Sequence, residues 1–233
     1  MPGRIARLFC QAILFDLDGV LVDSTASIEE AWRLWAVRHG LDPSAVLRVA
    51  HGRRGLDTVR LVAPHLDAAR EVAEQNAHEA RTRGLAAAPG ARALIEKLPP
   101  SCWAVVTSGV RAVAEHRLRT VALPIPPVMV CADEVVHGKP DPEGFLAAAA
   151  RLGVPPSACV VIEDAPAGLD AAHAAGMPAV AVASTYPPDA LRMANIVVHS
   201  LEAVTLRVSD RGKTCRLHLD ASSSGLTARD PSA

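Results

Sequence analysis

The chain has 233 residues, of which half are hydrophobic and only 3% aromatic, and its formal net charge is −1. This length provides for one large domain or two modest ones, with a core built mainly from aliphatic side chains. The near-zero charge gives no basic footprint for nucleic acid, and no stretch reaches the roughly 18 apolar residues of a transmembrane helix. Five scattered cysteines without a C-x-x-C pair are typical of reduced thiols. We therefore expect a cytoplasmic protein without nucleic-acid or membrane partners.

The first part of the chain combines one buried strand with a long helical stretch. Residues 1–10 are interpreted as a lead-in, and the apolar run within 11–17 is typical of a strand buried on both faces. Helical spacing of apolar residues then predicts helices over about 26–39, 56–63 and 67–83. Because no convincing strand lies between residues 24 and 88, this segment is predicted to be a helical insert.

Strands and helices alternate after residue 89. The predicted strands are 103–107, 127–131, 159–163, 179–183 and a short one at 196–198, and the predicted helices are 91–97, 110–120, 142–152 and 166–175. Such alternation implies right-handed crossovers and a parallel sheet covered on both faces. The fold class is therefore predicted to be α/β, with a doubly wound, Rossmann-like parallel sheet. Residues 209–233 are polar and Ser-rich. An edge strand is predicted over Lys213–Leu219 and disorder over 221–233.

Two carboxylates follow the first predicted strand. Asp16 and Asp18 are two residues apart, so in an extended chain both side chains face the same site. Two acids at the end of a buried strand repel each other, and a cation or a proton is the usual remedy. Gly19 comes next, where the backbone must leave the sheet or approach a ligand closely. Taken alone, the pair is equally consistent with a strand that ends in a solvated acidic turn.

Other polar groups occur at the ends of later strands or on the loops between them. They are Thr107 and Ser108, Lys139, and Glu163 and Asp164. The two hydroxyls precede a predicted helix, whose N-terminus suits an anion, and the lysine lies in a Gly-Lys-Pro loop. Taken singly, these residues are equally typical of helix caps or of a surface lysine. Because ligands bind beyond the carboxyl ends of parallel strands, we expect the groups to meet at one site.

The combined set predicts phosphoryl chemistry. Acids from two strand ends can hold Mg²⁺, which favours phosphate oxygens, while Lys139 and a hydroxyl neutralise a phosphoryl group. Asp16 is then placed to attack phosphorus, and Asp18 to give a proton to the leaving oxygen and later take one from water. A dinucleotide site is not favoured, because no G-x-G-x-x-G follows the first strand. A P-loop is not favoured, because Gly138-Lys139 lacks the rest of that motif.

These motifs resemble those of the haloacid dehalogenase superfamily, in its phosphatase branch with a helical cap. They are Phe-Asp-Leu-Asp-Gly-Val-Leu-Val-Asp-Ser (15–24), Val-Val-Thr-Ser-Gly (105–109), Gly-Lys-Pro-Asp-Pro (138–142) and Val-Ile-Glu-Asp-Ala-Pro-Ala-Gly (161–168). The likeness covers about residues 11–208. It implies a core domain formed by 1–23 and 89–208, a helical cap domain over 24–88, and a polar, partly disordered tail over 209–233.

The resemblance also implies roles for single residues. Asp16 would be the nucleophile and Asp18 the general acid and base, and Thr107, Ser108 and Lys139 would bind the phosphoryl group. Mg²⁺ would be held by Asp16, Asp164 and the backbone carbonyl of Asp18, with Glu163 supporting the metal site. These assignments describe a Mg²⁺-dependent phosphatase that works through an aspartyl-phosphate.

A closer likeness concerns the predicted cap. His51-Gly52-Arg53-Arg54, followed by Asp57, looks like the glycerol-3-phosphate and 2-deoxyglucose-6-phosphate phosphatases. By this likeness the substrate is a small sugar or polyol phosphate, and His51 and Arg54 are expected to contact it. Arg54 could instead hold Asp57 as a structural pair, since its planar fork suits any carboxylate.

Two other functions stay open at this point. One is a sugar phosphomutase of the same superfamily, whose β-phosphoglucomutase members carry a cap arginine three residues after the loop glycine, where this chain has Gly55. The other is a non-catalytic binding module, against which the intact set of acids and lysine argues. The expected partner is a small phosphorylated metabolite, and the expected state is a monomer or weak dimer.

Overall fold

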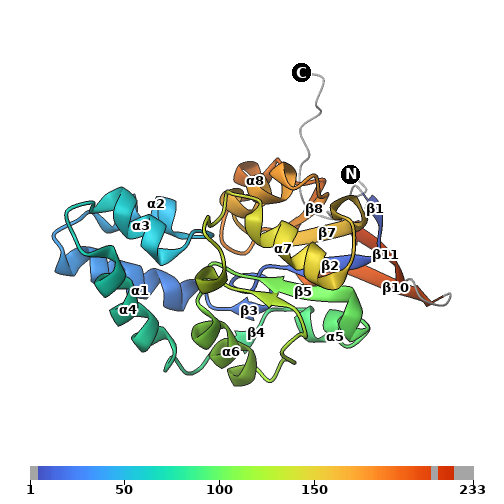
Figure 1. Ribbon diagram of the computed structural model, residues 1–233, viewed down its shortest axis with the longest axis horizontal. Helices are drawn as coiled ribbons and strands as arrows, with labels where there is room; N and C mark the ends of the chain where they lie inside the picture. The colour runs from blue at the N-terminus through green and yellow to red at the C-terminus, as the bar shows by residue number, and fades with distance from the viewer. Residues whose placement is uncertain (1–4, 211–214, 223–233) are drawn as a thin grey trace, which may run out of the picture.

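A computed structural model of the chain describes residues 5–210 and 215–222. Within these residues the main sheet is six-stranded and parallel, in the order β6-β5-β2-β7-β8-β9 (Figure 1). Its strands are β2 (Ala12–Phe15), β5 (Trp103–Val106), β6 (Met129–Val130), β7 (Cys159–Glu163), β8 (Ala179–Val182) and β9 (Ile196–Val198). The α/β class and the parallel sheet predicted from the sequence are confirmed.

The first predicted strand is central in this sheet. β2 pairs in parallel with β5 on one side, where Phe15 lies opposite Val105, and with β7 on the other, where Phe15 lies opposite Ile162. All residues of these three strands are buried, as expected for strands covered on both faces. The carboxyl ends of β2, β5 and β7 therefore lie side by side.

Helices cover both faces of the sheet. They are α5 (Ala91–Ile95), α6 (Arg111–Thr120), α7 (Glu143–Leu152) and α8 (Pro166–Ala174). Helices α5 and α6 pack in one hydrophobic cluster with Ile13 and Phe15, while α7 and α8 pack in another with Ala12 and Leu14. Since alternate residues of β2 point to opposite faces, the two helix pairs lie on opposite sides, which makes the sheet doubly wound.

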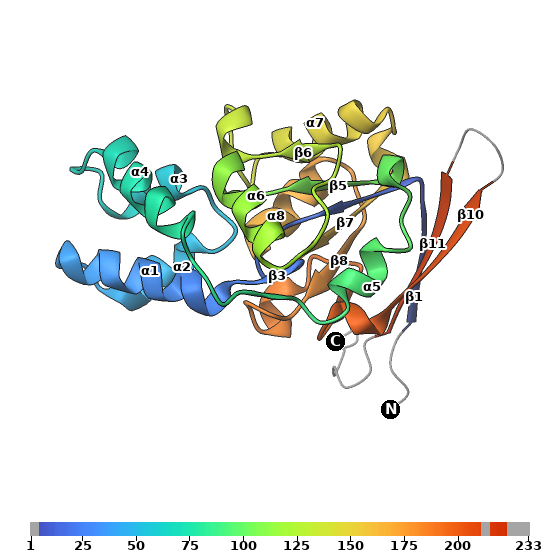
Figure 2. The ribbon, with the colours of Figure 1, turned by 90° about the horizontal axis from the view of Figure 1, so that it is seen from below.

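The segment between β2 and β5 is mainly helical and lies to one side of the sheet (Figures 1 and 2). It contains α1 (Thr25–Arg38), α2 (Pro43–Ala50), α3 (Gly55–Val62) and α4 (Ala68–Glu79). These helices share a hydrophobic cluster of their own around Trp32 and Trp35. Helix α2 was missed from the sequence although its start carries two common signals, an Asp42 side chain that accepts from Ser44 N–H and a proline at the first helical position.

Two short strands join the helical segment to the sheet. β3 (Val22–Asp23) pairs antiparallel with β4 (Ala86–Ala87), so the outgoing and returning connections run side by side. The expectation of no strand between residues 24 and 88 is wrong at β4, which is too short to leave an alternating pattern. Helix α4 ends at Glu79, earlier than the predicted end at residue 83.

Described segments near the two chain ends form a second sheet that was not predicted as such. β1 (Ile5–Cys10), β11 (Cys215–Ser222) and β10 (Val204–Asp210) pair antiparallel, with β11 in the middle. The lead-in prediction is therefore wrong over residues 5–10, and the described part of the predicted edge strand, from residue 215, is central in its sheet; residues 1–4, 213 and 214 lie outside the described residues. The reason is burial, because Leu217 and Leu219 are fully buried in the cluster that includes α5. The disorder expected at 221–233 is wrong for the two residues that end β11; residues 223–233 lie outside the described residues.

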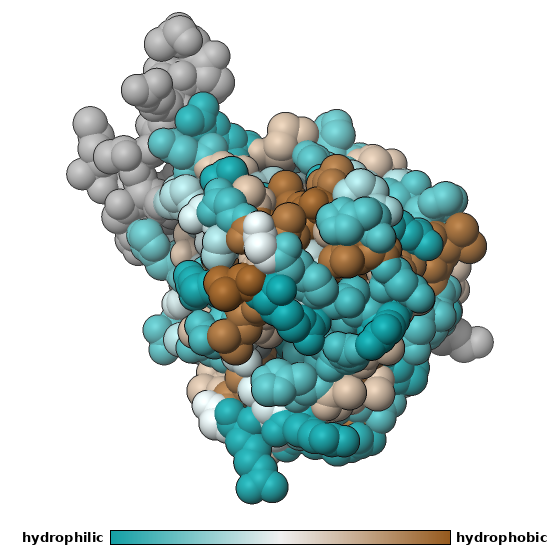
Figure 3. Space-filling model, turned by 90° about the vertical axis from the view of Figure 1, so that its left-hand side faces the viewer, coloured by the Kyte–Doolittle hydropathy of each residue, from teal (hydrophilic) through white to brown (hydrophobic). Residues whose placement is uncertain are grey.

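The surface of the helical segment is of mixed polarity. Viewed from that end, hydrophobic side chains lie between hydrophilic ones (Figure 3). The exposed large hydrophobic residues of the segment are Leu34, Val37 and Leu61. Across the described ranges 5–210 and 215–222, no helix combines the length and the apolar character needed to cross a membrane.

Candidate active site

A cleft lies between the carboxyl ends of the central strands and the helical segment. From the core it is lined by Asp16, Asp18, Thr107, Ser108, Gly109, Arg117, Asp164 and Thr185, and from the helical segment chiefly by Trp32, His51, Gly52, Arg53, Gln75, Asn76 and Glu79. The expectation that polar groups from separate strand ends meet at one place is met for Asp16, Thr107 and Asp164. The cleft combines acidic, hydroxyl and basic groups in one largely buried space.

Lys139 is the centre of a buried charge cluster beneath this cleft. Its Nζ lies 2.5 Å from Asp16 Oδ1 and 2.6 Å from Glu163 Oε1, and it also donates to the Val106 carbonyl at 3.1 Å. An ammonium group has three N–H donors, so all of them are used by protein oxygens. The lysine therefore acts on the cleft through its charge and through the orientation of Asp16.

Burial is the largest single influence on the pKa of each of these groups. It raises the pKa of Asp16 to about 7, although Lys139 pulls this value down. Burial, together with Glu163 and Asp16, holds the pKa of Asp164 well above its usual range. For Lys139, burial alone would lower the pKa, but Asp16 and Glu163 outweigh it and raise the pKa. Carboxylates so placed need more positive charge than one lysine provides.

Glu163 holds the cluster together. Its Oε1 accepts from Lys139, and its Oε2 accepts from the backbone N–H groups of Asp164 and Ala165 at 2.7 and 2.8 Å. The side chain is fully buried and fits closely against Gly168, where an added Cβ would lie 1.8 Å from Oε1. Both oxygens are thus occupied by the protein, which suits a supporting role for this residue.

Gly19 allows Asp164 to reach the same site. Its φ is +76°, a conformation that favours glycine, and an added Cβ would lie 2.1 Å from Asp164 Oδ2. The Gly19 carbonyl accepts from Ser184 Oγ at 2.6 Å, which fixes the turn. The glycine after the Asp-x-Asp pair is therefore required both for the turn and for the close approach of the second acid.

Asp18 is held by partners that the sequence did not reveal. Its Oδ1 accepts from Ser24 Oγ at 2.6 Å, and its Oδ2 accepts from Arg117 Nη1 at 2.5 Å. Arg117 is only 3% exposed, and its Nη2 donates to Glu79 Oε2 at 2.8 Å. No sequence motif links Arg117 to Asp18, because they are 99 positions apart and meet only when α6 folds against the sheet.

The two hydroxyls after β5 differ in what they contact. Thr107 Oγ1 accepts from the Gly109 N–H at 3.0 Å, which leaves its own O–H free to donate into the cleft. Ser108 Oγ instead donates to the Gly52 carbonyl at 2.9 Å, in the helical segment. Thr107 is therefore the better placed donor for a phosphoryl oxygen, and Ser108 joins the core to the helical segment.

The two predicted contacts of the helical segment also differ. His51 lines the cleft, and burial lowers its pKa, although Glu29 and Asp18 oppose that shift. Arg54 binds Asp57 through two N–H groups, at 2.6 and 3.0 Å, and donates to two carbonyls of the loop after β6. This arrangement favours the structural pair that the sequence left open, and it is Arg53 that lines the cleft.

The acid cluster suits a hard divalent cation. The oxygens of Asp16, Glu163 and Asp164 lie within 4.8 Å of one another and all three residues are buried, with Lys139 as their charged partner. Oxygen donors with excess negative charge are the ligands that Mg²⁺ prefers. Asp16 and Asp164 are the residues that would hold it, since Glu163 is occupied by Lys139 and two backbone N–H groups.

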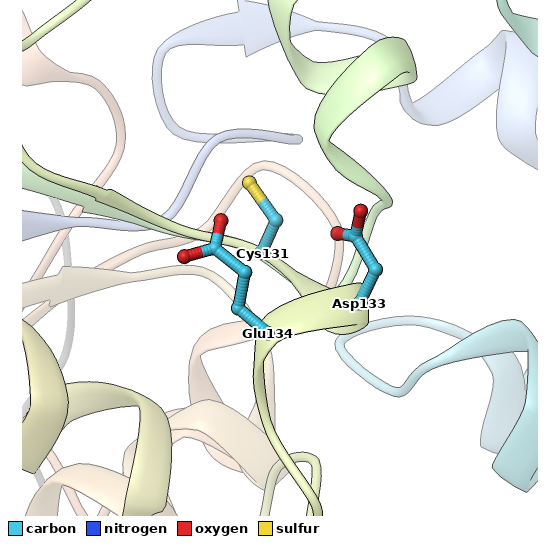
Figure 4. Close-up of side chains that lie close together, drawn as sticks. All are labelled: Cys131, Asp133 and Glu134. Atoms are coloured by element: carbon cyan, nitrogen blue, oxygen red, sulfur yellow. The ribbon is translucent and has the colours of Figure 1, made fainter.

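A second cluster in the described part of the chain is different in kind. Cys131, Asp133 and Glu134 project from the end of β6 and the turn after it (Figure 4). Burial raises the pKa of the Cys131 thiol to about 12. Glu134 pairs with Arg111 and Arg151, and Asp133 accepts from the Arg111 backbone N–H. These carboxylates already have cationic or N–H partners, so we assign no ligand to this cluster.

The fold and the site define an α/β enzyme with an acidic, lysine-containing centre at the carboxyl edge of its sheet. The family model of the haloacid dehalogenase-like hydrolases matches residues 10–176, and the chain belongs to this family. It is 41% identical over 213 residues, 87% of this chain and 97% of the relative, to hexitol phosphatase A of Escherichia coli. It is 31% identical over 210 residues, 80% and 85%, to 2-deoxyglucose-6-phosphate phosphatase 1 of Saccharomyces cerevisiae.

A solved structure agrees with these relatives. The crystal structure of a hydrolase from Pseudomonas syringae matches with a TM-score of 0.73 and 29% identity, over 82% of this chain and 94% of that one. The resemblance drawn from the sequence motifs is confirmed by the family match. The enzyme class, a phosphoric monoester hydrolase, is confirmed by relatives that are named phosphatases.

Proposed function

We propose that this enzyme is a Mg²⁺-dependent phosphatase that hydrolyses a small sugar or polyol phosphate through an aspartyl-phosphate on Asp16. The observation that carries the proposal is the buried cluster in which Lys139 lies 2.5 Å from Asp16 Oδ1, beside Asp164 and below the cleft. This cluster provides a carboxylate nucleophile with one oxygen fixed and the other available for attack.

In the first step the free oxygen of Asp16 forms a bond to phosphorus while the bond from phosphorus to the leaving oxygen breaks. The charge of Lys139 lowers the repulsion between the attacking carboxylate and the phosphate dianion. Thr107 donates its O–H to a phosphoryl oxygen. When bound, Mg²⁺ would add positive charge at Asp16 and Asp164 and offset the negative charge of the phosphoryl oxygens.

Asp18 moves the protons in both steps. Its carboxyl gives a proton to the leaving oxygen in the first step, and the resulting carboxylate takes one from water in the second. That water attacks phosphorus, the bond to Asp16 breaks, and inorganic phosphate and the free Asp16 carboxylate are regenerated. The Ser24 hydroxyl and the Arg117 guanidinium fix the Asp18 carboxyl where it lines the cleft.

The substrate class rests on the part of the cleft formed by the helical segment, which we propose to be a cap over 24–88. Polar side chains line it, among them His51, Gln75 and Asn76. Among the described side chains that line it, Gln75 has a buried Nε2 without a hydrogen-bond partner, and the buried Nε2 of His51 has only Glu29 nearby, at 3.7 Å. Such atoms are costly unless a ligand pairs with them, and hydroxyl groups are suitable partners. The names of the relatives, one a hexitol phosphatase and one a deoxysugar phosphate phosphatase, support the same class.

The direct test is phosphate release from a panel of phosphorylated metabolites with and without Mg²⁺. The panel holds hexitol phosphates, glycerol phosphates, aldose phosphates and a nucleoside monophosphate. Mg²⁺-dependent release with preference for a polyol or sugar phosphate is expected. A preference for the nucleotide would contradict the substrate class.

The phosphomutase alternative needs its own assay. The enzyme is incubated with glucose 1-phosphate, a trace of glucose 1,6-bisphosphate and Mg²⁺, and both glucose 6-phosphate and free phosphate are measured. Free phosphate is expected to exceed glucose 6-phosphate. Faster accumulation of glucose 6-phosphate than of free phosphate would show that the enzyme is a phosphomutase and would contradict the proposed phosphatase activity.

A further inference from the structure

Both connections to the helical segment are linked to Asp18 by hydrogen bonds, one directly and the other through Arg117. Ser24, which donates to Asp18 Oδ1 at 2.6 Å, is the last residue before α1 on the outgoing connection. Glu79 is the last residue of α4 at the start of the returning connection, and it reaches Asp18 through Arg117. Arg117 itself lies on α6 and lines the cleft together with Asp18 and Glu79.

The bridge through Arg117 is a buried structure. Its side chain is 3% exposed, Asp18 is 19% exposed and Glu79 is 16% exposed. One guanidinium thus joins two carboxylates, with Nη1 on one and Nη2 on the other. A planar guanidinium that is held at both ends fixes the position of each carboxylate. Removing the arginine would leave two neighbouring, partly buried acids without their cation.

We propose that Arg117 is a positioning residue, held by Glu79, that aligns Asp18 for proton transfer and makes this alignment depend on where the helical segment lies. The inference rests on the proposed role of Asp18 in acid–base catalysis. Each carboxylate oxygen has a second lone pair, so Asp18 can exchange a proton with the leaving group while Ser24 and Arg117 stay bound. Displacement of the end of α4 would separate Glu79 from Arg117 and leave Asp18 as the remaining carboxylate partner of the guanidinium.

The leaving group separates this role from a purely structural one. An alkyl phosphate such as sorbitol 6-phosphate needs its leaving oxygen protonated, whereas 4-nitrophenyl phosphate releases a stable phenolate without an acid. A general acid contributes about 10²–10⁴-fold, and misalignment forfeits part of that. Arg117→Ala is therefore expected to lower kcat/KM for the alkyl phosphate about 10- to 100-fold more than for the aryl phosphate.

Two further measurements make the test selective. Guanidinium ion added at a non-denaturing concentration is expected to restore Arg117→Ala on the alkyl phosphate and to change the aryl rate little. Glu79→Gln keeps an acceptor oxygen. It is expected to lower the ratio of alkyl to aryl kcat/KM, as Arg117→Ala does, but by less. Arg119→Gln is the matched control, because Arg119 is on the same helix, is 64% exposed and pairs with Glu115; the ratio should stay at the wild-type value.

The variants separate the role of Asp18 in proton transfer from the positioning role of Arg117. Asp18→Asn should change the ratio of alkyl to aryl kcat/KM; if it does not, the proposed function of Asp18 fails. If Asp18→Asn changes this ratio while the Arg117 and Glu79 variants lower kcat/KM equally for both substrates, only the positioning role is overturned. Should Arg117→Ala not fold, Arg117→Lys keeps the charge but has no planar fork, and the same shift in the ratio is required of it.

Discussion

Replacement of Lys139 by methionine removes the charge at the centre of the buried cluster and keeps most of the side-chain volume. In the native protein Lys139 donates to Asp16, Glu163 and the Val106 carbonyl, and its side chain is 5% exposed. Lys139→Met leaves buried carboxylates without their cation. Enzyme activity is expected to fall, and so is the thermal stability of the metal-free protein.

The loss of stability follows from the burial. Breaking a buried ion pair by removing one partner costs about 3–5 kcal/mol, because the remaining charge is left without compensation. For a chain of this size each kcal/mol shifts the melting temperature by about 2–4 °C, so a decrease of about 6–20 °C is expected for the metal-free protein near pH 8. At pH 6 the decrease should be smaller, because Asp16, whose pKa is already raised to about 7 by burial, takes up a proton.

Thermal unfolding of the metal-free wild type and Lys139→Met at both pH values provides the measurement. Lys97→Met is the control, because Lys97 is exposed just after α5 and its replacement should change the free energy of unfolding by no more than about 0.5 kcal/mol. A Lys139→Met protein as stable as the control at pH 8 would show that the cluster is not held together by this lysine, and the reasoning would be refuted.

Four other changes have defined outcomes. Asp16→Asn should lower turnover by several orders of magnitude in a phosphate-release assay, with deamidation back to aspartate excluded by mass spectrometry; near-normal turnover would exclude the covalent route. A chelator should abolish activity and Mg²⁺ restore it, Ca²⁺ should substitute poorly because of its looser coordination, and Asp164→Ala should raise the Mg²⁺ requirement; full activity in excess chelator would contradict this. The raised pKa of Asp16 means that the folded state keeps a proton which the unfolded state releases above pH 4. The free energy of unfolding of the metal-free enzyme, measured by urea titration, should therefore fall as the pH rises from 5 to 7. It should fall less steeply with pH in Asp16→Asn. Gly168→Ala should lower both melting temperature and activity, since its Cβ would lie 1.8 Å from Glu163 Oε1; an unchanged protein would contradict the close fit.

The sheet and the position of its acids could be predicted because they depend on local patterns. A buried apolar run followed by Asp16 and Asp18 defines both a central strand and the end at which chemistry occurs. Parallel topology then brings Thr107 and Asp164 to the same edge without knowledge of any contact. The roles that the motifs imply for single residues remain predictions, which the variants above test.

Other features depend on contacts that the sequence does not display. Arg117 reaches Asp18 from α6, and a lone arginine on a helix looks like any surface charge until the helix is packed. The strand β11 looks polar because its outward residues alternate with Leu217 and Leu219, which are buried against the main core. The orientation of Arg54 toward Asp57 and away from the cleft is likewise decided by the packing of its loop against residues 135 and 136.

Detection of a phosphorylated Asp16 tests the central claim most directly. The enzyme, Mg²⁺ and a ³²P-labelled polyol phosphate are mixed, quenched in acid within milliseconds, and digested for peptide analysis. A transient label that hydroxylamine removes, located on the peptide that contains Asp16 and absent from Asp16→Asn, is the expected result. Rapid phosphate release with no labelled peptide at any time, or a label on a different residue, would contradict an aspartyl-phosphate at Asp16.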